Sequence, residues 1–239
     1  MENKLQSKGP DTHTPKPASE VSLIVAEVYK AVIEQRLAPN TKLSEGRLCE
    51  IFGVGRMHVR RALLLLSSQG IIELHSNRGA FVACPDKSEA SDVFAARQLI
   101  EPPLVRQLAA GISESSLALL TDHIALEDAA RDQNERTEII RLSGEFHTKL
   151  AEATGNQFIL RMMRELVTRT SLIVGLFGSS KDASCPDDEH NKILNAIQSG
   201  EPDKAEALLK THLKHIQNGL DMHITKPPHD DLGIILGSN

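Results

Sequence analysis

The chain has 239 residues, of which 40% are hydrophobic and only 3% aromatic, and its formal net charge is −5. This apolar content excludes a wholly disordered chain, and with so few aromatic residues Leu, Ile, Val and Ala must fill the core, a composition that favours helices. No apolar run reaches the ~18 residues of a membrane span, and three scattered cysteines without a CxxC pair argue against a disulfide framework. We therefore expect a cytoplasmic, helix-rich protein of one large or two modest domains.

Charge is divided unevenly along the chain. Residues 1–84 hold 11 Lys and Arg against 8 Asp and Glu, a net charge of +3, whereas residues 85–239 hold 16 against 24, a net charge of −8. This asymmetry indicates a basic part that faces nucleic acid and an acidic part with another role. Charge alone also leaves open ordinary local variation in a helix-rich chain.

The amino-terminal part begins with a polar, proline-containing arm over residues 1–18, which we expect to be disordered. Apolar residues then recur at helical spacing, with Ser44 as a helix cap and Gly53 in a turn that favours positive φ. The elements expected in residues 19–84 are helices over about 19–38, 44–51 and 55–68 and strands over 71–74 and 80–82. Three helices followed by a two-stranded wing make a winged helix-turn-helix domain.

Positive side chains gather on the third predicted helix and at the tip of the predicted hairpin. Arginines at the start of a helix suit the major groove, where a guanidinium can fork onto a guanine edge, and a basic hairpin tip suits the DNA backbone. A solvated helix face is the alternative interpretation. The candidate DNA-binding residues are Arg56, His58, Arg60, Arg61, Asn77, Arg78 and Gly79.

Beyond a short linker expected at residues 85–88, the pattern is helical throughout. We predict one all-helical domain over residues 89–224 and a flexible tail over 225–239, in which residues 232–236 are apolar enough to dock. Pro102-Pro103 is expected to break or restart the first helix, since proline lacks a donor and clashes with the preceding turn. The helical segments lie near residues 88–111, 113–131, 134–153, 156–177, 187–198 and 202–224.

Three histidines, His147, His190 and His212, lie on separate predicted helices, each among apolar neighbours. A single histidine in such a setting is usually a core residue, whereas three that converge would bind a divalent metal such as Zn, Ni, Cu or Fe. Spacing leaves both interpretations open. Arg97 is a further candidate, either in an i,i+4 ion pair with Glu101 or as a bidentate partner for a carboxylate.

Two other histidines of this domain are expected to lie at the surface. His123 falls on the second predicted helix of the domain, and His215 follows His212 by one turn. A position one turn from His212 would also allow His215 to line the same cavity. Asn156, after Gly155, is expected to cap a helix.

Residues 21–82 resemble the DNA-binding domain of the GntR family of bacterial transcription regulators. The motifs that carry this resemblance are Leu43-Ser44-Glu45, Leu48 to Val54, Gly55 to Leu63 and Gly79 to Val82. By this resemblance Arg56 and Arg60 are expected to contact the operator. Two positions depart from the family pattern: Arg61 stands where an acidic residue is usual, and Gly46 where Arg or another polar residue is frequent.

Residues 90–220 resemble the all-helical FCD effector domain of the FadR-type branch of this family. The motifs that carry it are Val93 to Glu101, Phe146-His147 with Leu150 to Asn156, Glu189-His190 with Ile193 to Ile197, and Ala205 to His212. The resemblance implies a mainly α protein, with a bundle of about six or seven helices behind the winged domain. It also implies an internal cavity in that bundle.

In many members of that branch, one Asp and three His hold a divalent metal that helps to bind the carboxylate of a small organic acid. His147, His190 and His212 match the three histidines, but Ser143 stands at the position of the aspartate. A hydroxyl is a poor ligand, so the metal would be completed by water or by the acid, or the histidines would bind an anion without metal. Zn or Ni is the expected metal, and the candidate effector-binding residues are Arg97, Ser143, His147, His190 and His212.

The sequence thus predicts a ligand-responsive, homodimeric transcription regulator, a repressor by the commoner family behaviour, that binds an inverted repeat in duplex DNA. A small acid in the bundle would shift the helices beneath the linker at residues 85–88. One alternative is a metal-independent dimeric regulator that no ligand controls. Another is a three-histidine metalloenzyme, which the lack of an HExxH motif and of a nucleophile elbow argues against; we predict that the chain is not an enzyme.

Overall fold

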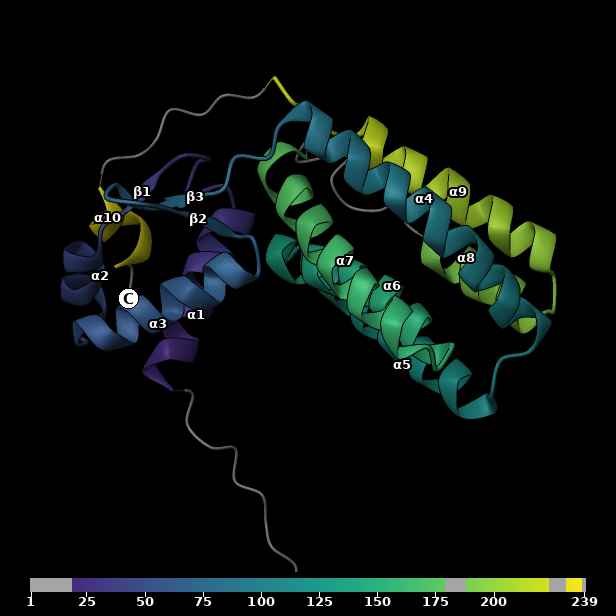
Figure 1. Cartoon of the computed structure of the whole chain (residues 1–239). Coiled ribbons are helices and arrows are strands. Elements are labelled where there is room, and N and C mark those ends of the chain that lie inside the picture. Colours follow the sequence, from purple (N-terminus) through teal and green to yellow (C-terminus); the bar gives the residue numbers. More distant parts are fainter. Residues whose placement is uncertain (1–18, 179–187, 224–230, 238–239) are drawn as a thin grey trace, which may run out of the picture.

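The computed structural model describes residues 19–178, 188–223 and 231–237, so the arm expected over residues 1–18 lies outside the described part. A small winged domain lies beside a larger bundle of long helices (Figure 1). This arrangement confirms the predicted mainly α fold. Within the described residues, no helix combines the length and the hydropathy that crossing a membrane requires.

The winged domain contains three helices packed around a small apolar core. Ile24 and Val28 of the first helix are fully buried, as are Leu48 of the second and Leu66 of the third. Gly53 has a φ of 64°, which allows the sharp turn between the second and third helices. The helices are α1 (Glu20–Ile33), α2 (Glu45–Phe52) and α3 (Arg56–Ser68).

The wing is a three-stranded antiparallel sheet, one strand more than predicted. The strands are β1 (Lys42–Leu43), β2 (Ile72–His75) and β3 (Gly79–Val82), in the order β1-β3-β2. β1 escaped prediction because two residues are too few for alternation to show; its Leu43 is buried and lies opposite Ala80. At the hairpin tip, Asn77 and Gly79 take positive φ, and Arg78 N–H donates to the His75 carbonyl at 3.1 Å.

The second domain consists of six long helices in the described residues. Asp86 caps the first of them by accepting from Glu89 N–H at 2.7 Å, and the helix begins within the expected linker. Asn156 accepts from two amides at the start of the fourth helix, which confirms it as a cap. The helices are α4 (Lys87–Ala110), α5 (Glu114–Asp132), α6 (Arg136–Ala153), α7 (Gln157–Phe177), α8 (Glu189–Gln198) and α9 (Pro202–Asn218).

The prediction that Pro102-Pro103 breaks the first of these helices is wrong, because α4 continues through both prolines. α4 packs along α9 on one side and against α7 on another, and Phe94, Leu104 and Val105 are buried there. This apolar packing outweighs the cost of interior prolines, about 3 kcal/mol or more for a typical site.

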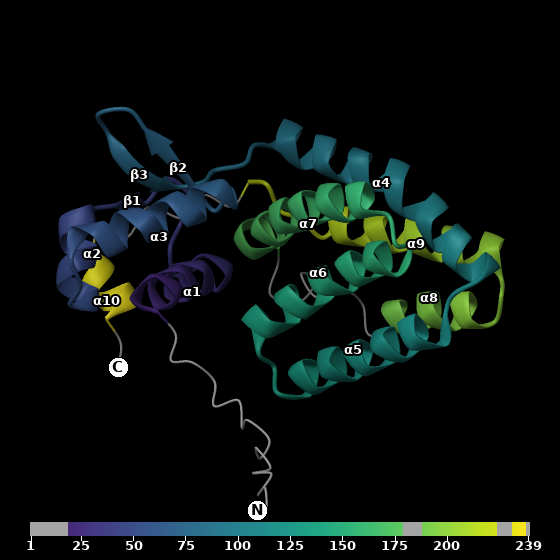
Figure 2. The ribbon, with the colours of Figure 1, turned by 60° about the horizontal axis from the view of Figure 1, so that its bottom comes forward.

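The winged domain packs directly on the helical domain through α1 and α7 (Figure 2). The contact is so close at Gly175 that a Cβ there would lie 2.7 Å from Ile33 Cδ1 and 3.1 Å from Ile33 Cα. Polar groups add to it, since Arg169 Nη1 donates to the Gly70 carbonyl at 2.9 Å and Gln35 Nε2 to that of Leu176 at 3.2 Å. The two domains therefore share an interface in addition to the linker.

Replacing Gly175 with valine is expected to lower the free energy of unfolding by about 1–3 kcal/mol, because the new side chain overpacks the junction of α1 and α7. Urea unfolding followed by circular dichroism measures this change. Gly111→Ala is the matched control, since Gly111 has extended backbone and open space around its Cβ position. Equal stabilities of the two variants would show that α1 and α7 are not packed this closely.

The flexible tail predicted from residue 225 onward contains a helix, α10 (Leu232–Leu236), and in this segment the prediction is wrong. Leu232, Ile235 and Leu236 are buried, and α10 contacts α1 and α2 of the winged domain. The sequence indicated that residues 232–236 are apolar enough to pack on another part of the chain, but it did not predict that this part would be the winged domain. The last part of the chain thus returns to the first domain (Figure 1).

Candidate functional site

The three candidate histidines converge inside the helical domain, each from a different helix. His147 comes from α6, His190 from α8 and His212 from α9, and all three are almost completely buried. Nε2 of His212 lies 3.1 Å from Nε2 of His147 and 3.2 Å from Nε2 of His190. Phe146 stacks on the His190 ring with a centroid distance of 4.0 Å, which fixes the orientation of that ring.

Each of these histidines has a glutamate on its outer nitrogen. The pairs are His147 Nδ1–Glu101 Oε2 at 2.5 Å, His190 Nδ1–Glu127 Oε2 at 2.8 Å and His212 Nδ1–Glu189 Oε2 at 2.8 Å. The carboxylates of Glu101 and Glu189 are ionised and can only accept, so Nδ1 of His147 and of His212 carries the proton, and the Nε2 atom of each presents a lone pair to the centre. Sequence reasoning missed all three glutamates as parts of this site, although Glu189 adjoins His190 and Glu101 had been paired with Arg97.

Burial keeps the three imidazoles neutral. It lowers the pKa of His147, His190 and His212 below the usual value, well below for the first two. Burial opposes ionisation of Glu101 as well, but the neighbouring Arg97 and His147 bring its pKa down to about 2. The pKa of the Glu189 carboxyl is also lowered, since hydrogen bonds from His212 and His215 offset its burial.

Glu127 differs from the other two carboxylates. Burial raises its pKa to about 7 despite His123 and Arg131 beside it. The prediction that His123 lies at the surface is wrong: it is buried where α5 packs on α6, and its Nε2 donates to the Leu142 carbonyl at 2.8 Å. His215, in contrast, is half exposed and bonds to Glu189.

The residues present fit a divalent cation. The Nε2 lone pairs of His147 and His212 lie 3.1 Å apart and repel each other, and the His190 Nε2 lies 3.2 Å from that of His212, so a cation between the three rings would remove this repulsion. Nitrogen ligands ~2.0–2.1 Å from a common Zn²⁺ lie about 3.0–3.4 Å apart, and the two separations from the His212 Nε2 fall in this range. Among the described residues only the three histidines form such a cluster, and no carboxylate completes it. Ser143, the residue at the family's aspartate position, instead lines the neighbouring cavity.

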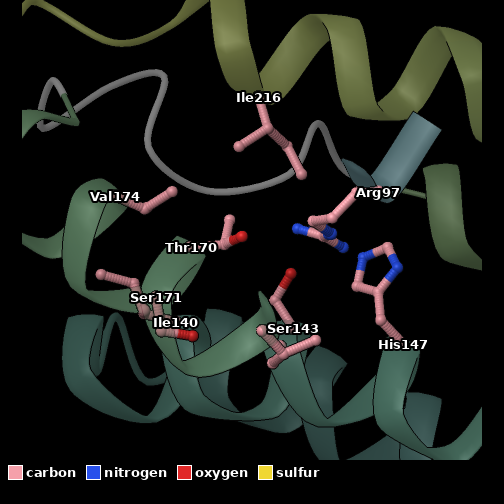
Figure 3. Close-up of a pocket in the computed structure, with 10 residues that line it drawn as sticks. Arg97, Ile140, Ser143, His147, Thr170, Ser171, Val174 and Ile216 are labelled. Carbon is pink, nitrogen blue, oxygen red and sulfur yellow. The ribbon is translucent and has the colours of Figure 1, made fainter. Parts of the chain in front are cut away.

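A cavity adjoins the histidines between α4, α6, α7 and α9 (Figure 3). It has room for only a few water-sized molecules, about 30 Å³ for their centres, and about 360 Å³ of empty space when its open mouth is included. His147, Arg97 and the hydroxyl-bearing Ser143 and Thr170 face it, while Ile216 and other apolar side chains cover the remaining wall. A recess that combines apolar walls with several convergent hydrogen-bonding side chains suits a small polar molecule.

Arg97 forms the expected i,i+4 ion pair with Glu101 and also lines the cavity. Its Nε donates to Glu101 Oε1 at 2.5 Å, so the ion pair exists, yet the side chain is buried and forms part of the cavity wall. Its Nη2 is buried and has no hydrogen-bond partner in the described part of the chain. A buried guanidinium N–H without an acceptor is costly, so this group is suited to receive a carboxylate from a ligand.

The candidate DNA-binding residues lie on the exposed face of α3 and at the wing tip. Arg56, His58, Arg60 and Arg61 are exposed along α3, as are Asn77, Arg78 and Gly79 in the hairpin. Arg60 Nε bonds Glu45 at 3.0 Å, and His58 Nδ1 lies 2.8 Å from Glu20. Arg56 has no ion pair within the described residues.

A winged helix-turn-helix joined to a helical bundle with an internal cavity defines a DNA-binding transcription regulator with an effector domain. The family model described as "Bacterial regulatory proteins, gntR family" matches residues 21–82, and the FCD domain model matches residues 92–215. The chain therefore belongs to the GntR family and, within it, to the FadR-type branch that carries an FCD domain. Members of this family are transcription regulators, not enzymes.

Curated relatives agree with this assignment. The chain is 30% identical over 202 residues to the HTH-type transcriptional repressor NanR of Salmonella arizonae, with 72% of this chain and 73% of the relative covered. It is 28% identical over 200 residues to NanR of Klebsiella aerogenes (72% and 74% covered) and 24% identical over 192 residues to the repressor RspR of Escherichia coli (79% and 83% covered).

Solved structures show the same fold. A GntR regulator from a Rhodococcus species superposes with a TM-score of 0.68 at 23% identity, covering 83% of this chain and 95% of that one. McbR/YncC of Escherichia coli superposes with a TM-score of 0.65 at 16% identity, covering 82% and 94%.

Proposed function

We propose that this chain is a transcription repressor whose helical domain binds a divalent metal and, beside it, a small organic acid. The observation that carries the metal is the convergence of three buried Nε2 atoms, each held by a carboxylate on the far side of its ring. Anion binding by the histidines without metal is disfavoured, because the Nδ1 protons already point outward and Nε2–H donors would be needed. The named relatives support the repressor role.

The acid would bind in the cavity next to the histidines. Arg97 Nη2 would donate to its carboxylate, and the hydroxyls of Ser143 and Thr170 would orient its other polar groups. A bound Zn²⁺ or Ni²⁺ would offer open coordination positions to the same carboxylate. Since Ser143 brings no charge, the acid would supply the anionic ligand that an aspartate provides in many relatives.

Ligand binding in the cavity would affect the DNA-binding domain through α7, which forms part of the cavity wall and also packs on the winged domain. Val167, Thr170 and Val174 of α7 line the cavity, while Leu172 and Leu176 of the same helix belong to the apolar core of the winged domain. A shift of α7 would therefore move the surface on which α1 packs. We propose that the chain acts as a homodimer on an inverted repeat, so that a change in this support alters the spacing of two recognition helices.

The test is to measure bound metal in the purified protein by elemental analysis, and then operator affinity with and without a panel of three- to six-carbon hydroxy, keto and dicarboxylic acids. Stoichiometric metal, together with release of DNA by at least one acid, is the expected result. Unchanged DNA affinity throughout the panel and no retained Zn²⁺ or Ni²⁺ would instead mark the chain as a regulator that no ligand controls.

Arg97→Lys is expected to raise the acid concentration needed for half-release of DNA about 10- to 150-fold, because lysine lacks the guanidinium fork and loses a charge-assisted bond of about 1.5–3 kcal/mol. A fluorescence titration of labelled operator with the active acid measures it. Arg106→Lys on the same helix is the control, since Arg106 is exposed and pairs with Asp203 and Glu206. Equal half-release concentrations for the two variants would show that Arg97 does not bind the acid.

A further inference from the structure

The carboxy-terminal helix α10 is seated on the helix-turn-helix itself. Leu232, Ile235 and Leu236 point into the core of the winged domain, whereas Ile234 is 74% exposed. α10 contacts both α1 and α2, and the views in Figures 1 and 2 place it beside these helices. The helix therefore buries one apolar face against the DNA-binding domain and leaves the other in solvent.

Polar groups fix the orientation of α10. Arg36 donates to the Ile235 carbonyl, and Asp231 Oδ1 caps the helix by accepting from Gly233 N–H at 2.9 Å. The same Asp231 oxygen lies 3.4 Å from Nη2 of Arg47. Gly233 makes this approach feasible, since a Cβ there would lie 2.6 Å from Arg47 Nη2. The carboxylate is thus held against the Arg47 guanidinium by the helix that it caps.

Arg47 occupies a position where DNA is expected. It lies in the first turn of α2, the first helix of the helix-turn-helix, and that helix crosses the DNA backbone in this motif. The same turn adjoins the recognition helix, because Glu45 pairs with Arg60 of α3. The Arg47 side chain is 47% exposed, and its Nη1 is already bonded to Glu50 at 3.0 Å, so Nη2, which faces Asp231, is the nitrogen that can reach a phosphate.

We propose that α10 is an autoinhibitory element, in which Asp231 occupies an Arg47 guanidinium that otherwise contacts a DNA phosphate. DNA competes with Asp231 for this cation, and the apolar anchors of α10 keep the carboxylate in place. Hydrogen bonding from Gly233 N–H and the charge of Arg47 lower the pKa of Asp231, which keeps it ionised. This role concerns DNA binding alone and does not depend on a metal or an acid.

The test is Asp231→Asn, which keeps an acceptor for Gly233 N–H but removes the charge. Binding of the full chain to a labelled 30-base-pair duplex of mixed sequence is measured between 50 and 200 mM salt. One added phosphate contact should tighten binding at 50 mM salt and steepen the slope of log K against log salt by about 0.9, so the affinity ratio across this range grows roughly 3.5-fold. Asp122→Asn, an exposed site on α5, makes the same charge change far from α2.

Two further comparisons separate the proposed contact from a general effect. In an Arg47→Ala background, Asp231→Asn should no longer steepen the slope. Ile235→Ser, which removes an anchor, should steepen it as Asp231→Asn does, whereas Ile234→Ser on the exposed face should not. Equal slopes for the Asp231 and Asp122 variants, or a gain that survives without Arg47, would overturn the proposal. Because Asp231→Asn spares the apolar anchors, this result stands even if Ile235→Ser unfolds the domain.

Discussion

His212→Ala is expected to lower the affinity for Zn²⁺ or Ni²⁺ more than about 100-fold. His212 Nε2 lies within 3.2 Å of both other histidine Nε2 atoms, so its removal leaves a two-ligand site that no described carboxylate completes. Loss of a residue that only hydrogen-bonds to a metal ligand typically lowers metal affinity 10–100-fold, and loss of a ligand itself should lower it more. Competition with a chromophoric chelator measures the affinity.

His223→Ala serves as the control, because His223 is exposed and lies outside the cluster. It should bind metal like the unmodified chain. Circular dichroism would show whether His212→Ala remains folded, since removing a fully buried side chain also leaves a void. A folded His212→Ala protein with unchanged metal affinity would show that the three histidines are a hydrogen-bonded core cluster and not a metal site.

The sequence predicted the residues of this site better than their geometry. Histidines among apolar neighbours on three helices identify His147, His190 and His212, because helical spacing determines which residues face inward. Their glutamate partners depend on how five helices, α4, α5, α6, α8 and α9, are rotated about their axes, and no local sequence pattern predicts that rotation. The same limit explains His123, which was expected at the surface but is covered by α6.

The sequence predicted the elements that have long local patterns, and it failed for the elements whose structure depends on tertiary contacts. The recognition helix, the wing and the long helices follow from apolar periodicity and caps. Pro102-Pro103 argued for a break, but packing against α9 and α7 overrides the local penalty. α10 is five residues long and forms only because the winged domain receives it, so no local pattern predicts its place.

The arginines of α3 differ in a way that only the structure shows. Arg60 is already held by Glu45 at 3.0 Å, so contact with DNA must first displace or share that carboxylate. Arg56 stands in the first turn of α3, is exposed and has no ion pair in the described residues, so its guanidinium reaches a base edge at no such cost. We therefore predict that Arg56 contributes more to operator recognition than Arg60.

Arg56→Ala is expected to reduce the preference for the operator by about 1–3 kcal/mol, or roughly 5- to 150-fold, through loss of a bidentate contact to one guanine. The operator is first selected from genomic fragments by the unmodified protein, and each variant is then titrated with operator and mixed-sequence duplexes at one salt concentration. Lys30→Ala, an exposed site on α1 that pairs with Glu34, controls for loss of charge.

The ratio of the two affinities decides the role of Arg56, because a phosphate contact weakens both duplexes alike whereas a base contact weakens only the operator. Arg60→Ala should lower the ratio less, since releasing Glu45 offsets part of what that arginine gains on DNA. A ratio unchanged by Arg56→Ala, with both affinities reduced, would place Arg56 on the backbone and shift base recognition to Arg60 or to the wing.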